Sequence, residues 1–311
     1  MPGIGVVVNP YARGNQRRKD RTERLSHIVG DDGVVAQTNG LREIDDVARE
    51  FRERAVEILA VCGGDGTIFR TVTAFRRVWG DRELPMLLPL RAGTINVIAA
   101  SIDCIHGSPE RVLSHVVHDF RRGRTHDTVE RELICVNGNE YGFLFGLGII
   151  VNFLRVYYTS PNPGPLRAAG LLVKFATSAL FGTSLARATF QPFGADMDCD
   201  GERLPFRRFS FLLGMTIEHL PLGFRPGYLA TRKHDYFHLL TGPISPPRVV
   251  RHLHRFRYGL PVSDEGLYDN LARDLRITFD RPTHYMIDAD ILGPVDRLHV
   301  TAGPRVRLVR G

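Results

Sequence analysis

Residues 58–78 read ILAVCGGDGTIFRTVTAFRRV, and this stretch decides the fold. Its first five residues are apolar, and such an uninterrupted run fits a parallel strand that is covered on both faces. Ile68, Val72 and Phe75 then recur at the spacing of a helix. The glycines between the two segments let the backbone approach a ligand closely, and the following helix would offer its N-terminal N–H groups to an anion. The stretch therefore predicts a strand, an anion-binding loop and a helix.

The same alternation of strand-like and helix-like segments continues through residues 1–124. Repeated alternation predicts a parallel sheet with helices on both faces, and ligands bind such sheets at the carboxyl ends of the strands. Asn9, the glycine loop 63–67 and the loop 93–96 each follow a predicted strand, so we expect them to meet at one edge. The other predicted strands are 4–8, 34–36 and 87–90, and the other helical patterns are 44–51 and 112–120.

After Arg124 the pattern changes to short alternating runs separated by Gly, Pro, Asn and Asp, which is typical of a β-rich domain. One helix-like insertion interrupts these runs, at residues 166–181. The predicted fold class is therefore an α/β N-terminal domain, a parallel sheet with helices on both faces, followed by a C-terminal β-sandwich-like domain. The boundaries that we expect are 1–124 and 125–311.

Composition narrows the class of partner. The 311 residues carry a formal net charge of +7, almost all of the excess being arginine, which suits anionic partners such as phosphates or anionic lipid headgroups. No groove-entering motif appears, so a nucleic-acid binder is not expected. The four cysteines form no CxxC pair, and we expect free thiols in a reducing compartment. No apolar run reaches the roughly 20 residues of a membrane span.

Asp65 stands inside the glycine loop, where a carboxylate would repel phosphate unless a cation or a proton transfer uses it. It is therefore a candidate for organising Mg²⁺ or for acid/base chemistry. The alternative is a tight glycine turn in which Asp65 only caps the helix. The loop is not a Walker A loop, because no Gly-Lys-Ser/Thr follows, and it is not a GxGxxG fingerprint.

Three motifs together resemble the catalytic domain of the diacylglycerol kinase and sphingosine kinase family. They are Asn9-Pro10, the loop 63–67 (Gly-Gly-Asp-Gly-Thr) and the loop 93–96 (Gly-Thr-Ile-Asn), in that family's order and at about its spacing. The resemblance implies an ATP-dependent lipid kinase that moves the γ-phosphoryl group to a hydroxyl of a diacylglycerol- or sphingoid-type lipid, with Mg²⁺ as cofactor. It also implies that residues 1–124 bind the nucleotide and that residues 125–311 bind the lipid.

The resemblance assigns nucleotide-binding positions residue by residue. Arg13 stands where the family usually has Ser-Gly, and a charged contact to phosphate is chemically reasonable there. Val97 stands where the family often has aspartate, so a carboxylate is missing near the nucleotide. The implied nucleotide-binding residues are Asn9, Arg13, Thr38, Gly63, Gly64, Asp65, Gly66, Thr67, Gly93, Thr94 and Asn96.

The implied catalytic residues are Asp65 and an acidic group near the C-terminus, where relatives carry Asp-Gly-Glu. Residues 200–202 have these letters, but they come early and resemble a hairpin turn. Residues 288–290 (Asp-Ala-Asp) lie at the right distance from the end, so we favour Asp290. Whether Asp65 or Asp290 is the general base stays open. The family's metal loop would fall at 227–235, where only Asp235 is acidic, so the metal ligands are not identified.

The helix-like segment 166–181 has an apolar face that would cover lipid tails as a lid or would pack as a core helix. The expected partners are a lipid substrate and the surface of an anionic membrane, with a homodimer left open. We expect a cytoplasmic protein that is peripheral at the inner face of the membrane. The alternatives are an NAD kinase-like enzyme and a catalytically weak nucleotide-binding pseudokinase with a regulatory role.

Overall fold

The computed structural model describes residues 3–159 and 164–310 and divides the chain into two compact units. Unit 1 comprises residues 1–131 together with 305–311, and unit 2 comprises residues 132–304. Strand β5 (Thr128–Val136) carries the chain from unit 1 into unit 2, and strand β15 (Asp290–Val309) carries it back.

Unit 1 is built on a parallel sheet whose central strands, β1 and β3, are buried. The order is β4-β3-β1-β2, and the last residues of β15 pair with β4 in the same direction. Because β2 lies on one side of β1 and β3 lies on the other, the chain changes direction across the sheet between β1 and β3. Such a switch point opens a crevice at the carboxyl ends of the strands. The bounds are β1 Ile4–Val8, β2 Gly33–Gln37, β3 Ile58–Gly63 and β4 Met86–Arg91.

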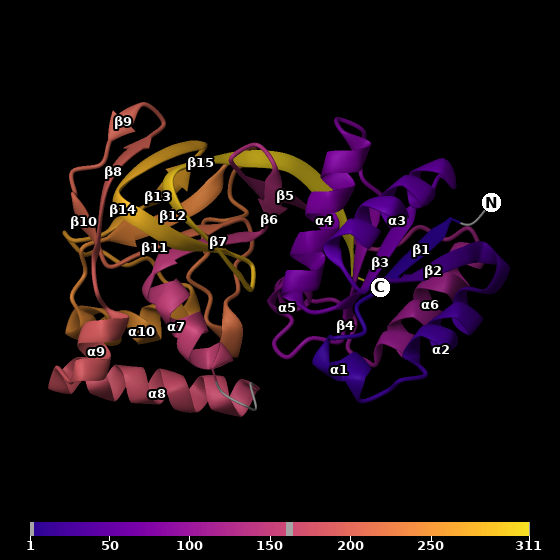
Figure 1. Ribbon diagram of the computed structural model, residues 1–311, viewed down its shortest axis with the longest axis horizontal. Helices are drawn as coiled ribbons and strands as arrows, with labels where there is room; N and C mark the ends of the chain where they lie inside the picture. The colour runs from indigo at the N-terminus through magenta and orange to yellow at the C-terminus, as the bar shows by residue number, and fades with distance from the viewer. Residues whose placement is uncertain (1–2, 160–163, 311) are drawn as a thin grey trace. The chain divides into compact units, whose positions relative to one another are not determined.

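Helices cover both faces of this sheet (Figure 1). Alternate residues of β1 face opposite sides, so that Val6 and Val8 pack with α2 and α6, whereas Gly5 lies against Phe51 of α3. On that second face Phe51 meets Phe75 of α4 edge to face, with ring centroids 5.9 Å apart. The bounds are α1 Arg13–Gln16, α2 Arg21–Val29, α3 Leu41–Glu53, α4 Asp65–Trp79, α5 Val97–Ser101 and α6 Pro109–Arg121, and the 3₁₀ helix η1 spans Gly30–Asp32.

Unit 2 is built on antiparallel strands. The order β13-β12-β11-β7-β14 is continuous, and β14 also pairs with β8 and β15. The bounds are β6 Glu140–Gly142, β7 Leu144–Gly148, β8 Phe193–Cys199, β9 Glu202–Arg203, β10 Arg208–Phe209, β11 Phe211–Met215, β12 Phe237–Gly242, β13 Tyr268–Ala272 and β14 Asp274–Ile287. The predicted fold class, an α/β part followed by a β-rich part, is confirmed.

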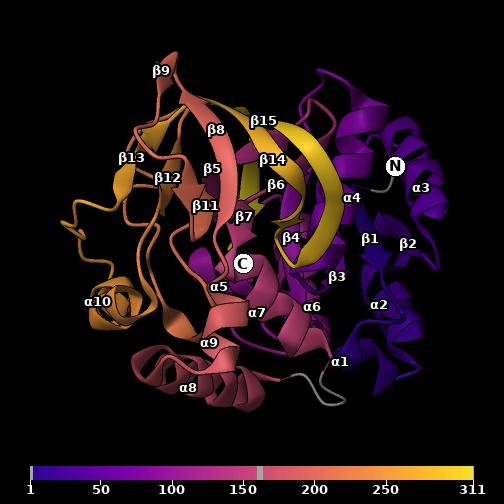
Figure 2. The ribbon, with the colours of Figure 1, turned by 60° about the vertical axis from the view of Figure 1, so that its left-hand side comes forward.

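The helix predicted at residues 166–181 is present as α8, but it is one of several helices in the second half. The described part of unit 2 contains four helices, which lie together in Figures 1 and 2 and are α7 Ile149–Tyr158, α8 Pro165–Phe181, α9 Ser184–Thr189 and α10 Pro246–Tyr258, besides the 3₁₀ helix η2 Pro221–Gly223. Helix α10 escapes prediction because Arg and His occupy much of its length, which hides the apolar period. Among the described residues, no helix combines the length and the apolar character needed to cross a membrane.

Candidate active site

Three loops of unit 1 meet at the carboxyl edge of the sheet, as the sequence predicts. The first loop follows β1, the second is residues 63–67 after β3, and the third is residues 92–96 after β4. Asn9, after β1, donates its side-chain N–H to the hydroxyl of Thr67 at 2.9 Å. The backbone N–H of Gly14 donates to the carbonyl of Ala92, after β4, at 2.9 Å. Gly64 and Gly93 approach so closely that a Cβ atom on Gly93 would lie 2.4 Å from the Cα atom of Gly64. Glycine is therefore required at this contact between the second and third loops.

The glycine loop 63–67 leads into the first turn of α4. Gly63 ends β3, Gly64 precedes the helix with extended backbone, and Asp65, Gly66 and Thr67 form its first turn. The positive end of the helix dipole thus lies at the switch point between β1 and β3. Such an arrangement favours an anionic group at the helix N-terminus.

Asp65 uses both carboxylate oxygens to hold the third loop. One oxygen accepts from the backbone N–H of Val97 at 2.9 Å, and the other accepts from that of Ile98 at 3.0 Å. These are N–H groups at the start of α5, which have no partner within their own helix. Burial raises the pKa of Asp65, while the two N–H groups and the positive charge of Arg91 act in the opposite direction. Asp65 therefore links the second loop to the third, whatever further role it has.

Asn96 closes the third loop on itself. Its side-chain oxygen accepts from the N–H of Gly93 at 3.0 Å, and its side-chain N–H donates to the carbonyl of the same residue at 3.1 Å. Its backbone is left-handed, with φ 55° and ψ 56°, a conformation that asparagine tolerates better than most residues. Thr94 lies half-buried within the loop.

The other two predicted residues lie at the same edge of the sheet. Arg13 is half-buried and begins α1, one residue before the Gly14 contact with the third loop. Thr38 follows β2, is buried, and donates its backbone N–H to the carbonyl of Val8 at 3.0 Å. The structure therefore brings the predicted nucleotide-binding residues of all four strand ends to one edge.

Asn15 is a buried member of this site that sequence reasoning missed. Its side-chain N–H groups donate to the carbonyls of Asn9 and Cys62, at 2.7 and 3.1 Å. Its side-chain oxygen accepts from the guanidinium of Arg21 at 3.3 Å, and Arg21 forms a buried ion pair with Glu110 on α6 at 3.2 Å. Asn15 thus fixes the first loop to the end of β3.

Cys62 also donates its thiol to the side-chain oxygen of Asn15, at 3.4 Å. Burial raises the pKa of the Cys62 thiol to about 11, so the thiol stays protonated at neutral pH and is unreactive. Cys62 belongs to the core beneath the site rather than to its chemistry.

Arg91 is the second residue that sequence reasoning missed. Its guanidinium donates to the carbonyls of Ala99 and Cys104, at 3.1 and 3.0 Å, and contacts the ring of His106 at 3.2 Å. These bonds hold the segment that follows the third loop. No sequence pattern marks Arg91, because its partners are backbone carbonyls 8 and 13 residues further along the chain.

The predicted acidic residues of unit 2 lie at the turn between β14 and β15. Asp290 begins β15 opposite Ile287 and is half-buried. Asp288 is buried and accepts the backbone N–H groups of Phe143 and Leu144, at 3.0 and 2.9 Å. Asp288 therefore holds the turn in place, which leaves Asp290 as the more accessible carboxylate.

The other candidate acidic residues, Asp200 and Glu202, belong to a different hairpin. Asp200 has a left-handed backbone in the turn between β8 and β9, and its carboxylate accepts the N–H groups of Arg273 and Asp274 at 3.0 and 2.7 Å. Glu202 is exposed on the two-residue strand β9. The predicted hairpin turn at residues 200–202 is thus present.

Magnesium does not fit a site made of side chains alone in this chain. Within residues 3–159 and 164–310, no group of three or more His, Cys, Asp or Glu residues is placed to hold a metal ion. Both oxygens of Asp65 are engaged by backbone N–H groups, and the apolar Val97 is its neighbour in the third loop. Mg²⁺ is commonly bound through substrate phosphates and only one or two carboxylates, so a nucleotide would have to supply most of its ligands.

A parallel sheet with three such loops at its switch point is an α/β unit of the kind that binds ligands at the carboxyl ends of its strands. Residues 3–126 match the diacylglycerol kinase catalytic domain, which confirms the resemblance that the three motifs predict. No curated protein matches the sequence significantly.

Solved structures extend the likeness of fold to the whole chain. A crystal structure described as that of "a putative diacylglycerol kinase from Bacillus anthracis str. Sterne" superposes with a TM-score of 0.70 at 13% identity, over 98% of this chain and 96% of the other. Two further structures of diacylglycerol kinases from the same strain, one also called putative, give TM-scores of 0.62 and 0.66 at 13% and 12% identity, with the same coverage. At these identities the likeness shows a shared fold.

Proposed function

We propose that this protein is an ATP-dependent lipid kinase, which transfers the γ-phosphoryl group of ATP to a hydroxyl of a diacylglycerol- or sphingoid-type lipid. The observation that carries the proposal is the meeting of the loops after β1, β3 and β4 at the switch point of the sheet. The match of residues 3–126 to the diacylglycerol kinase catalytic domain supports the same class of reaction.

In the proposed reaction the lipid hydroxyl oxygen bonds to the γ-phosphorus, and the bond from that phosphorus to the bridging oxygen breaks, releasing ADP. The hydroxyl proton passes to a carboxylate. Asp290 is our choice for this base, because it stands where relatives carry the acidic residue near the C-terminus and because it is half-buried, whereas Asp65 and Asp288 are buried. A base of this kind contributes roughly 10²- to 10⁴-fold to the rate.

The nucleotide phosphates would be held by the N-terminus of α4 and by the backbone of the three loops. The side chains of Asn9 and Arg13 are the candidate polar contacts, and Thr38 would lie near the nucleotide. Positioning and electrostatic stabilisation account for most catalysis of phosphoryl transfer, so a rigid set of loops is the main requirement. Magnesium would accompany the nucleotide and would offset the negative charge of its phosphates.

A catalytically weak pseudokinase is the second candidate, and one specific observation favours it. Val97 takes the place of a carboxylate in the third loop, and Asp65 is occupied by the N–H groups of Val97 and Ile98. A chain of this kind would still bind the nucleotide, since the loops and the N-terminus of α4 are intact, but it would transfer phosphate slowly.

The deciding experiment incubates the full-length protein with γ-labelled ATP and a panel of acceptors, with and without Mg²⁺. The panel contains diacylglycerol, monoacylglycerol, a sphingoid base, ceramide and NAD. Label in a lipid product supports the proposal and identifies the acceptor. Label in NAD replaces it by the NAD kinase-like alternative, and ATP binding without transfer favours the pseudokinase. Absence of ATP binding overturns all three.

A further inference from the structure

Helix α8 carries an apolar stripe that points away from unit 2. Leu166, Val173 and Leu180 recur every seven residues, which is close to two helical turns, so they form one line along the helix. They are 91%, 63% and 57% exposed, and the adjacent Phe181 is 81% exposed. Large apolar side chains exposed in one continuous row mark an interaction surface rather than the ordinary surface of a protein.

The opposite face of α8 is already buried in the unit. Leu171, Phe175 and Ala179 are nearly inaccessible, and Phe175 meets Phe153 of α7 edge to face, with ring centroids 5.6 Å apart. Ala179 packs in one apolar cluster with Val249 and Val250 of α10. The helix is therefore apolar on both faces, and core packing explains only the inner one. The alternative that residues 166–181 pack as a core helix therefore applies only to the inner face of α8.

Basic residues accompany the exposed stripe. Arg167 and Lys174 form a second line on α8, one residue further along than Leu166 and Val173. Helix α10, which packs against α8, adds the exposed Arg251 and Arg257. We call the outer face of α8 together with the exposed side of α10 the α8–α10 surface. Its exposed apolar and basic residues include Leu166, Arg167, Val173, Lys174, Leu180 and Phe181 on α8 and Arg251, His254, Arg257 and Tyr258 on α10.

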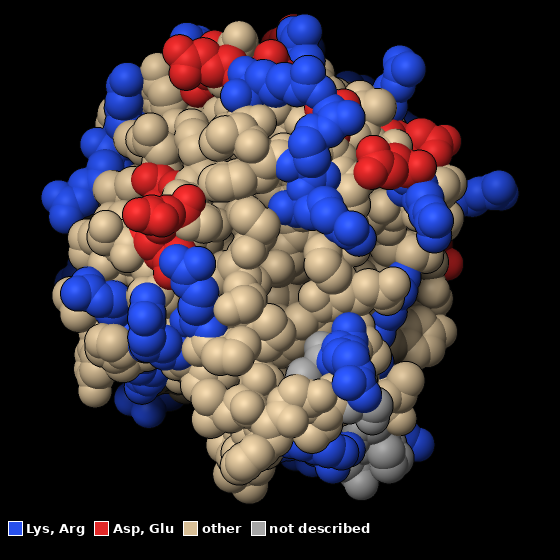
Figure 3. All heavy atoms as spheres, turned by 90° about the vertical axis from the view of Figure 1, so that its left-hand side faces the viewer, with Lys and Arg blue, Asp and Glu red and all other residues tan. Residues whose placement is uncertain are grey.

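Acidic residues are absent from the whole of the sequence that builds this surface. No Asp or Glu occurs between Glu140 and Asp196, which includes α7, α8 and α9, and none occurs between Asp235 and Asp264, which includes α10. The chain as a whole has 34 acidic residues in 311, so their absence from two such long stretches is a marked asymmetry. In Figure 3 the lower part of the face, where these helices lie, shows blue side chains among tan atoms, and the red ones gather higher up.

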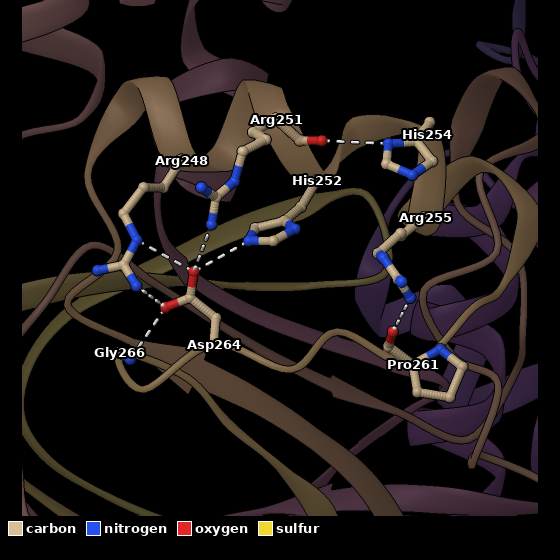
Figure 4. A network of polar contacts seen from close by, with 8 residues as sticks. All are labelled: Arg248, Arg251, His252, His254, Arg255, Pro261, Asp264 and Gly266. Carbon is tan, nitrogen blue, oxygen red and sulfur yellow. Dashed lines mark hydrogen bonds and ion pairs between the residues drawn. The ribbon is translucent and has the colours of Figure 1, made fainter.

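Asp264, which lies beside α10, has a buried carboxylate that is already paired. It accepts two bonds from Arg248, at 2.5 and 3.0 Å, one from His252 at 2.9 Å and one from the N–H of Gly266 at 3.0 Å, and it forms a longer ion pair with Arg251 at 3.8 Å (Figure 4). Arg255 and Arg257 donate to the carbonyls of Pro261 and Gly223, which are uncharged partners. The α8–α10 surface is therefore both apolar and positively charged.

We infer that the α8–α10 surface docks unit 2 onto the surface of an anionic lipid bilayer, with the stripe of α8 entering the interface and the basic residues meeting the headgroups. Helices that lie in a membrane interface combine these two features. A second copy of this chain is a poor occupant, because a two-fold contact through α8 would bring the basic residues Arg167 and Lys174 of both copies into one interface that has no acidic residue on α8 to pair with them. The inference deepens the proposed function by naming the surface that would bring the protein to a lipid substrate.

The test is flotation of the full-length protein with vesicles, in the absence of ATP. One set of vesicles is phosphatidylcholine alone, and the other contains about 30% phosphatidylglycerol, so that the surface is anionic. We expect binding to the anionic vesicles that weakens as salt is raised, because salt screens the charged part of the attraction. No binding to anionic vesicles, or equal binding to both sets at every salt concentration, overturns the inference.

Matched substitutions assign the binding to this surface. Leu180→Glu is compared with Leu41→Glu on α3 of unit 1, since both leucines are 57% exposed, and Lys174→Gln is compared with the exposed Lys19→Gln. We expect Leu180→Glu to weaken vesicle binding about tenfold or more and Lys174→Gln to weaken it severalfold, with both unit 1 variants unchanged. Equal losses in the unit 1 variants, or a dimer in solution that Leu180→Glu dissociates, contradict the inference.

The flotation result can be distinguished from the result of the kinase assay, because vesicle binding requires no ATP turnover. Vesicle binding by a protein that phosphorylates no lipid leaves the docking surface in place and removes the kinase. Phosphorylation of lipid dispersed in detergent by a protein that binds no vesicle leaves the kinase in place and removes the docking surface.

Discussion

Asp65 joins the second and third loops through hydrogen bonds from Val97 and Ile98 to its two oxygens. A carboxylate used in this way acts on the reaction by fixing the backbone around the nucleotide. A general base, in contrast, would need one oxygen within about 3 Å of the lipid hydroxyl. The two roles make different predictions for stability, because only the first makes Asp65 a structural link.

Asp65→Asn separates these roles. The substitution turns one acceptor into an N–H donor that faces a backbone N–H, so we expect the free energy of unfolding to fall by about 1 to 3 kcal/mol. Phosphate transfer should fall at the same time, because the third loop is displaced. Urea unfolding and the ATP assay are the measurements, and Asp81→Asn, at an exposed position, is the control. Loss of transfer with unchanged stability would instead identify Asp65 as the base.

Asn15 offers a second prediction at the scale of one residue. Asn15→Ala leaves the carbonyls of Asn9 and Cys62 and the guanidinium of Arg21 without this partner in a buried place, so we expect a loss of about 2 to 3 kcal/mol in stability. The first loop then loses its attachment to β3, and the KM for ATP should rise more than kcat falls. Gln16→Ala, at the exposed next position, should change stability by less than about 0.5 kcal/mol. Equal effects of the two substitutions would refute the role of Asn15.

The two missed residues show where sequence reasoning stops at this scale. Asn9, Asp65 and Asn96 could be predicted because each directly follows a strand, and parallel strands end at a common edge. Asn15 and Arg91 could not, because their roles consist of bonds to backbone carbonyls that only the folded chain brings near. The hydrogen bonds from the backbone N–H groups of Val97 and Ile98 to Asp65 could not be predicted either, because folding alone brings these groups together.

At the scale of elements, the buried carboxylate of Asp264 is one of the contacts that attach α10 to the rest of unit 2. Burial by itself raises the pKa of Asp264, but the hydrogen bond from His252, the N–H of Gly266 and the charge of Arg248 outweigh burial, so that the pKa lies below its usual value (Figure 4). A lowered carboxyl pKa means that Asp264 stabilises the fold above the ordinary carboxyl range. This contribution is lost as the pH falls through the lowered value.

We therefore predict that Asp264→Asn lowers the free energy of unfolding by about 2 kcal/mol at neutral pH. The difference between wild type and variant should shrink as the pH falls below the ordinary carboxyl range of about 4, and it should be lost as the pH passes the lowered pKa of Asp264. Thermal unfolding measured across this pH range provides the test. Glu265→Gln, at the exposed neighbouring position, is the control, and a difference that stays constant with pH would contradict the assignment.

Elements were predictable where their hydrophobic period was clean. The strand–helix alternation of unit 1 predicts β1, β3, β4 and α4 directly. In unit 2, α8 was predicted from its apolar residues, whereas α10 has the fully charged Arg248, Arg251 and Arg255 among its apolar positions. The contact between α10 and Asp264 is a tertiary contact, and the hydrophobic periodicity of the sequence cannot predict it.

At the scale of the whole molecule, the chain passes from unit 1 to unit 2 in β5 and returns in β15. The C-terminal residues thus complete the sheet of unit 1, where Leu308 pairs with Leu87 of β4. The sequence indicated an α/β part and a β-rich part, but it did not reveal this return, since a single strand of 20 residues shared by two units has no distinct pattern.

The same strand β15 begins with Asp290, and this residue decides between the two acidic motifs of unit 2. Asp290→Asn should lower lipid phosphorylation about 100-fold or more if Asp290 is the base. Asp290→Glu, which restores the side-chain length of the Asp-Gly-Glu motif, should retain activity. Glu202→Gln is the control, because Glu202 is exposed on the separate hairpin β8–β9, and it should stay within about twofold of wild type. The reverse pattern, a loss with Glu202→Gln and none with Asp290→Asn, would place the acidic group of the reaction in the other hairpin.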